Sequence, residues 1–133
     1  MIIFDRLSFA LNLARGRNAL FDKKYDLALE FLRKATSSGS VVNRGLLGEA
    51  DIFTAICSFR RGDTNEAIKL YEQGLKHLQE SGLYSMDELR YVSKYMEALL
   101  NGNLLVEDPI DIRNVRKSFR RDFPMEIATT ELR

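Results

Sequence analysis

The placement of helix-breaking residues constrains this chain more than any other feature. The sequence has 133 residues and only two prolines, Pro109 and Pro124, so its first 108 residues contain none. Four glycines fall about twenty residues apart, at Gly39, Gly62, Gly82 and Gly102. Segments of that length suit α-helices, because β-strands usually have about 5–6 residues. We therefore predict an all-α protein.

Apolar residues at helical spacing divide the chain into six segments, each ended by a breaker. The segments cover residues of about 6–21, 24–37, 44–61, 63–81, 85–102 and 108–124. Ser85 and Glu88 form an S-x-x-E capping box, and Asp63 is a good N-cap. Short connections imply antiparallel neighbours. We expect one domain over residues 1–124, with hairpins at about 6–37, 44–81 and 85–123, and a frayed tail at 125–133.

A stretch within residues 13–35 repeats within residues 53–75 at an offset of 39. At this offset Ala28 aligns with Ala67, Leu32 with Tyr71, and Ala35 with Gly74. Small residues let the second helix of a hairpin approach the first closely. The bulky residue four positions later fills the gap to the next hairpin.

This pattern resembles the tetratricopeptide repeat. The second repeat matches through Ala55, Phe59, the turn Arg61-Gly62-Asp63, Ala67, Tyr71 and Gly74, and the first through Gly16, Leu20, Tyr25, Ala28, Leu32 and Ala35. A third, weaker repeat contains Tyr91, Tyr95 and Asn101-Gly102-Asn103. The offset exceeds the family's period of about 34 residues, and the family's frequent tryptophan and proline are missing. The resemblance implies about three hairpins stacked as a short right-handed solenoid.

In that family, the first helix of each hairpin lines a concave face that binds peptides. Carried over through the aligned repeats, the candidate protein-binding residues are Leu13, Arg17, Leu20, Phe21, Ile52, Ile56, Phe59, Arg60, Val92, Met96 and Leu99. Most of them are large and apolar, which suits an apolar or amphipathic segment of a partner protein. Two alternatives stay open: half of these side chains belong to the hairpin core, or a terminal segment of the chain fills the groove.

The last predicted helix carries a basic stripe at helical spacing. Its members are Arg113, Arg116, Lys117, Arg120 and Arg121. Such a stripe suits nucleic-acid phosphates or an acidic partner. The alternative is a solvated outer face on the helix that caps a solenoid, and five charges are few for specific nucleic-acid binding.

Composition and motifs argue against catalysis, cofactors and metal sites. There is no phosphate-binding glycine loop and no nucleophile elbow. The single cysteine, Cys57, stands among apolar residues, and the single histidine, His77, stands in a polar stretch typical of a surface. The carboxylates are scattered singly, as on solvated helix faces. The longest apolar run, residues 1–4, is far below the roughly 20 residues of a membrane span. With no secretion signal apparent, we expect a cytoplasmic protein.

We therefore expect a non-catalytic protein–protein interaction module. It would act as an adaptor, or as a chaperone similar in architecture to the small helical-repeat chaperones of bacterial secretion systems. Two other functions stay open at this point. One is a nucleic-acid-associated regulator that uses the basic last helix, and the other is a scaffold that assembles into a homo-oligomer.

Overall fold

A computed structural model describes residues 2–37 and 44–102 of the chain. These residues form five helices and no strand: α1 (Ile2–Phe21), α2 (Tyr25–Ser37), α3 (Arg44–Arg60), α4 (Thr64–Ser81) and α5 (Met86–Leu100). The prediction of an all-helical protein is thereby confirmed for the described residues. The predicted sixth helix at 108–124, the second half of the third hairpin and the tail at 125–133 lie outside them.

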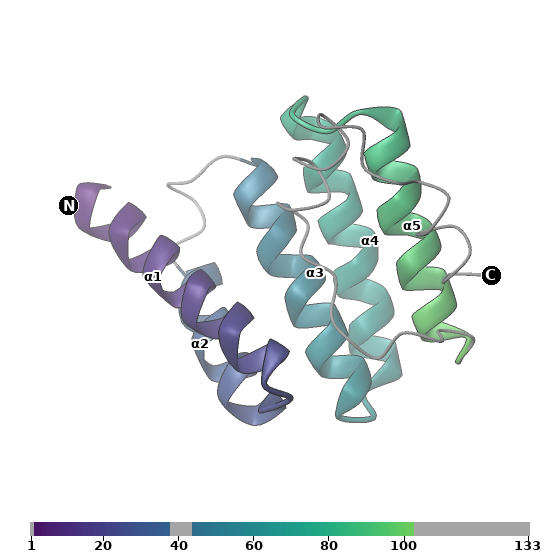
Figure 1. The fold of residues 1–133 in the computed structure, drawn as a ribbon. Helices are drawn as coiled ribbons and strands as arrows, with labels where there is room; N and C mark the ends of the chain where they lie inside the picture. The colour runs from purple at the N-terminus through teal and green to yellow at the C-terminus, as the bar shows by residue number, and fades with distance from the viewer. Residues whose placement is uncertain (1, 38–43, 103–133) are drawn as a thin grey trace.

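The helices pack in the order in which they follow one another along the chain (Figure 1). The α1–α2 and α3–α4 pairs have the most extensive contacts, the α2–α3 contact joins the two pairs, and α5 lies against α4. Residues from all five helices form one hydrophobic core, and only the outer faces of the helices lie outside it. Consecutive hairpins therefore share a core, as helical repeats do.

The helix boundaries follow the predicted segments closely, with one exception. The other four helices begin and end within two residues of the prediction, whereas α1 begins at Ile2, four residues before the expected start. Asp5 and Arg6 do not interrupt the helix, because neither residue breaks helical geometry. The capping box at α5 is confirmed: Ser85 accepts from the Glu88 N–H at 3.1 Å, and the Ser85 N–H donates to Glu88 at 3.0 Å.

The turns that close the two complete hairpins have the same backbone geometry at the offset of 39 residues. Lys23 has φ +61° and Gly62 has φ +89°. In each turn, this residue donates its N–H three residues back at 2.9 Å, and the next residue donates five residues back. This pair of bonds is the Schellman motif, in which the left-handed residue satisfies carbonyls at the end of the helix. The repeat seen in the sequence is therefore also a repeat of local structure.

An ion pair shows that the two turns lie at the same end of the molecule. Arg61 Nε, in the second turn, is 2.6 Å from Asp26 Oδ1, beside the first. The side chains are 47% and 85% exposed, so solvent screens the pair and its contribution to stability is small. The ion pair is therefore a consequence of the side-by-side placement of the hairpins and not its cause.

Paired glycines bring α3 and α4 into close contact. A Cβ on Gly48 would lie 2.9 Å from the carbonyl oxygen of Gly74 and 2.8 Å from Leu78. A Cβ on Gly74 would lie 2.9 Å from the Cβ of Asp51. Real Cβ atoms do not approach backbone this closely, so the two helices can keep this separation only with glycine at both positions.

The left-handed turn residues predict opposite effects of two substitutions. Gly62→Ala is expected to lower the free energy of unfolding by about 1 kcal/mol, because alanine is strained at positive φ. No atom lies within 4 Å of the added Cβ, so the loss reports backbone strain alone. Lys23→Gly is expected to raise stability by about 0.5–1 kcal/mol. Urea denaturation of both variants measures these values, and equal signs would contradict the equivalence of the two turns.

Candidate protein-binding site

The structure places most of the predicted apolar binding residues in one buried cluster. These residues come from the first helix of each predicted hairpin, α1, α3 and α5, and each is at most 5% exposed: Leu13, Leu20, Ile52, Ile56, Val92, Met96 and Leu99. The structure therefore brings together side chains that are far apart in the sequence. As described, they form continuous apolar packing and are closed to solvent.

The remaining four predicted binding residues reach the surface. Arg17, Phe59 and Arg60 are half-buried, and Phe21 is 38% exposed. They lie toward the C-terminal ends of α1 and α3, close to the turns that the Arg61–Asp26 ion pair shows to be side by side. We call these four residues the rim. Two aromatic rings and two guanidinium groups there can contact a partner directly.

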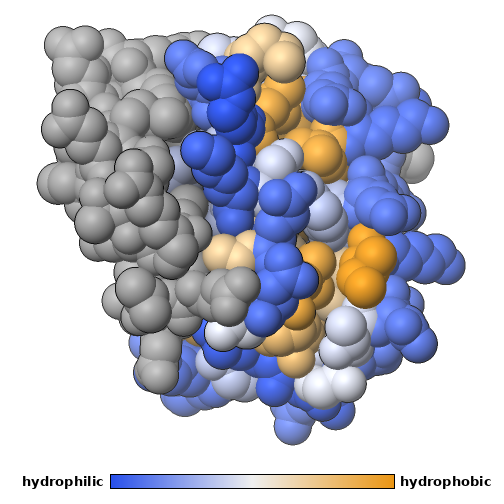
Figure 2. Space-filling model, turned by 90° about the vertical axis from the view of Figure 1, so that its right-hand side faces the viewer, coloured by the Kyte–Doolittle hydropathy of each residue, from blue (hydrophilic) through white to orange (hydrophobic). Residues whose placement is uncertain are grey.

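The predicted basic face lies outside the described residues. Its members are Arg113, Arg116, Lys117, Arg120 and Arg121. Figure 2 shows the α5 side of the molecule, where hydrophilic side chains cover most of the described surface and hydrophobic ones emerge in a few places. The exposed large apolar residues of the described chain are Leu7, Leu11, Phe21, Leu27, Ile68, Leu83 and Met86.

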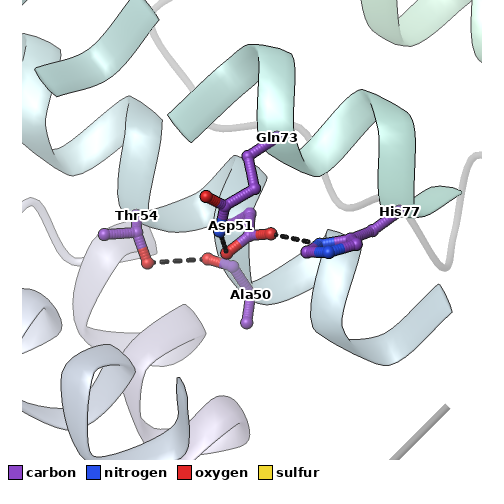
Figure 3. Close-up of polar contacts among 5 residues, drawn as sticks. All are labelled: Ala50, Asp51, Thr54, Gln73 and His77. Carbon is purple, nitrogen blue, oxygen red and sulfur yellow. Dashed lines mark hydrogen bonds and ion pairs between the residues drawn. The ribbon is translucent and has the colours of Figure 1, made fainter. Parts of the chain in front are cut away.

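α3 is the central helix of the described fold, and almost every side of it is buried. Residues 48–58 are all buried, including polar Glu49, Asp51, Thr54 and Ser58. A buried polar group costs free energy unless it forms hydrogen bonds. The Thr54 hydroxyl donates to the Ala50 carbonyl of α3 itself at 2.7 Å (Figure 3), whereas the two carboxylates find partners outside α3.

α4 supplies the partners of Asp51 (Figure 3). Oδ2 of Asp51 lies 2.7 Å from Nδ1 of His77, and Gln73 Nε2 donates to Oδ1 at 3.4 Å. Gln73 and His77 stand one helical turn apart, so both face α3. The side chain of Asp51 is 2% exposed and that of His77 is 14% exposed. The interpretation of His77 as a surface residue is therefore wrong.

Burial raises the pKa of Asp51 above its ordinary value of 3.8, and the hydrogen bond and the charge of His77 oppose that shift. Desolvation disfavours the carboxylate, whereas His77 and Gln73 stabilise it. The net direction is upward, so folding costs more when Asp51 is ionised than when it is neutral.

A second buried carboxylate of α3 bonds toward α5. The Tyr84 hydroxyl, just before α5, donates to Glu49 Oε1 at 2.6 Å, and Glu49 is 2% exposed. With Asp51, this contact corrects the expectation that the carboxylates lie on solvated faces. In the sequence, the only sign of these contacts was the presence of two acidic residues within a mostly apolar stretch of this helix.

The one cysteine is a poor nucleophile. Burial raises the pKa of the Cys57 thiol to about 12, so the reactive thiolate is scarce at neutral pH. Within residues 2–37 and 44–102, no group of three or more His, Cys, Asp and Glu side chains is placed to hold a metal ion. No helix in this part of the chain is long and apolar enough to cross a membrane.

Comparison with known proteins does not assign this chain to a family. No protein-family model matches it, and neither a curated protein nor a solved structure does.

The raised pKa of Asp51 predicts a pH-dependent effect of Asp51→Asn. Well below pH 3.8 the Asp51 carboxyl is neutral, as the amide of Asp51→Asn is at every pH, whereas ionisation of Asp51 as pH rises places a charge in the α3–α4 contact of the wild type. A raised folded-state pKa gives stability that is present at acid pH and lost as pH rises. The stability of Asp51→Asn relative to wild type should therefore increase from acid to neutral pH.

Chemical denaturation at both pH values measures this difference. Asp87→Asn, at a carboxylate with 63% side-chain exposure, is the control for a change of surface charge. A relative stability of Asp51→Asn that falls or stays constant as pH rises would contradict the effect of burial.

Proposed function

We propose that this chain is a tetratricopeptide-like, non-catalytic module that binds an apolar or amphipathic segment of a partner protein. The observation that carries the proposal is the rim, where Phe21 and Phe59 bring aromatic surface, and Arg17 and Arg60 positive charge, to the partly exposed ends of α1 and α3. In this proposal the chain acts as an adaptor or a chaperone.

The equivalence of the two hairpins supports the repeat assignment. Their turns share the Schellman geometry at an offset of 39 residues. The aligned small residues Ala28 and Ala67 are both fully buried, as are Ala35 and Gly74. Close helix approach at equivalent positions is what a stacked helical repeat requires.

The chemistry of the rim supports a particular kind of ligand. Phe21 and Phe59 offer aromatic surface, and the guanidinium groups of Arg17 and Arg60 add positive charge beside it. Aromatic residues and arginine contribute most to protein–protein binding free energy. A segment with apolar side chains and a nearby carboxylate fits this combination.

The burial of the titratable side chains supports a non-catalytic role. Asp51 and His77 bond to each other between two helices, and Cys57 is buried with a pKa of about 12. These groups lie in contacts between helices and not in an open site. The rim is where the described chain combines exposure with the residue types of an interface.

Site-specific photo-crosslinking tests the proposal. A photoreactive phenylalanine analogue replaces Phe21 or Phe59 in the tagged full chain, in its native cell, and Ile68 on α4, 39% exposed, is the matched control position. We expect Phe21 and Phe59 to crosslink to the same apolar segment of one protein. A synthetic peptide of that segment should then bind purified protein, and Arg17→Glu should weaken the binding about tenfold or more. Crosslinks equal to those from Ile68, or none, would contradict the proposal.

A further inference from the structure

α1 carries apolar residues on two opposite faces. Phe9 and Leu20 are fully buried. On the opposite side, Leu7 is 61% exposed and Leu11 is 51% exposed. An outer helix normally turns polar side chains to water, so the second apolar face calls for an explanation.

The exposed face has the spacing of a coiled-coil seam. Leu7, Leu11, Ala14 and Asn18 follow one another at intervals of four, three and four residues, the a/d pattern of a heptad repeat. We call these four residues the α1 seam. Leu11 and Asn18 occupy a positions, and Leu7 and Ala14 occupy d positions. Ala14 is half-buried and Asn18 is exposed.

The internal repeat shows what this face does elsewhere in the molecule. At the offset of 39 residues, the seam corresponds to Leu46, Ala50, Phe53 and Cys57 on α3. The last three are fully buried, and Leu46 packs against the same core. On α3, which contacts both helices of the preceding hairpin, these positions are covered. On α1, no helix among the described residues covers the equivalent face.

We propose that the α1 seam pairs with the α1 seam of a second copy of this chain, in a parallel, in-register two-fold dimer. An asparagine at an a position, here Asn18, specifies such a register by bonding to the same residue of the other helix. Seam on seam is an isologous contact, which closes at two copies.

Charge complementarity supports the same arrangement. In the heptad, Arg17 occupies a g position and Asp22 the following e position, which face each other across a parallel pair. The Asp22 N–H donates to the Asn18 carbonyl at 3.1 Å, so Asp22 continues the helical path beyond the end of α1. Each Arg17 then meets the carboxylate of the second copy's Asp22, twice by symmetry.

The seam lies on a different face of α1 from Leu13 and Leu20, but it borders Arg17 and Phe21 of the rim. Crosslinking at Phe59, which lies on α3, therefore separates this proposal from the partner-binding proposal above. Head-to-tail stacking, the competing arrangement, would place the seam on the far end of another copy. By the repeat, Ile68 on α4 corresponds to buried Leu29 of α2, and it is 39% exposed. Exposed apolar residues on this side of the described chain include Ile68 on α4 and Met86 on α5, so head-to-tail contacts would use this side and would form open chains.

Sedimentation equilibrium of the full-length protein tests the proposal. We expect the wild type to be a dimer at micromolar concentration. Leu7→Glu combined with Leu11→Glu should raise the dimer dissociation constant about 100-fold or more, with an unchanged helical circular dichroism spectrum because both residues are exposed. The matched control, Ile68→Glu combined with Met86→Glu, should remain a dimer. Met86 is 72% exposed and lies at the start of α5.

A charge reversal tests the register. Arg17→Glu alone should weaken the dimer about fivefold, and Arg17→Glu with Asp22→Arg should restore it. A monomeric wild type, a seam variant that stays dimeric, loss of assembly in the control, or masses above a dimer would overturn the proposal. Failure of the double reversal to restore the dimer would overturn the parallel register. None of these results bears on crosslinking at Phe59, so the two proposals can fail separately.

Discussion

The rest of the fold depends on the close approach of α3 to α4. Gly48 and Gly74 face each other across this contact, where either added Cβ would meet backbone or Cβ atoms at 2.9 Å. The separation brings Asp51 within bonding distance of His77 and Gln73. It also encloses α3, whose residues 48–58 are all buried. α2 packs on α3, and Tyr84, next to α5, bonds to Glu49.

The enclosure of α3 limits where on the described chain a partner could bind. The apolar residues of successive first helices meet in the interior, and on α1 the exposed large apolar residues include Phe21 in the rim and Leu7 and Leu11 on the outer face. At the offset of 39 residues, the counterpart of that outer face on α3 is buried against neighbouring helices. An end unit of a helical repeat needs either a polar outer face or a partner, and Leu7 and Leu11 are not polar.

Helix positions, caps and the repeat could be predicted from the sequence, because they depend on local periodicity and on residues such as Ser85, Glu88 and Gly62. Burial could not. Periodicity shows which residues share a face of a helix. It does not show that α3 is enclosed by its neighbours, or that His77 faces α3. For the same reason, the pattern did not distinguish buried Ile52 and Met96 from half-buried Phe59. The exposure of Leu7 and Leu11 depends on what packs against α1, which a single sequence does not specify.

The most direct test of this account is the free energy of unfolding of Gly48→Ala, compared with Gly16→Ala. On a helix with open space, glycine to alanine gains about 1 kcal/mol. At Gly48 the new methyl meets the Gly74 carbonyl, so we predict a net loss of about 2 kcal/mol. At Gly16 the closest atoms belong to the Leu32 side chain, and the nearest backbone atom, the Leu32 nitrogen, is farther away at 3.3 Å, so the loss should be smaller. A Gly48→Ala protein as stable as wild type, or more stable, would contradict the central role of the α3–α4 contact.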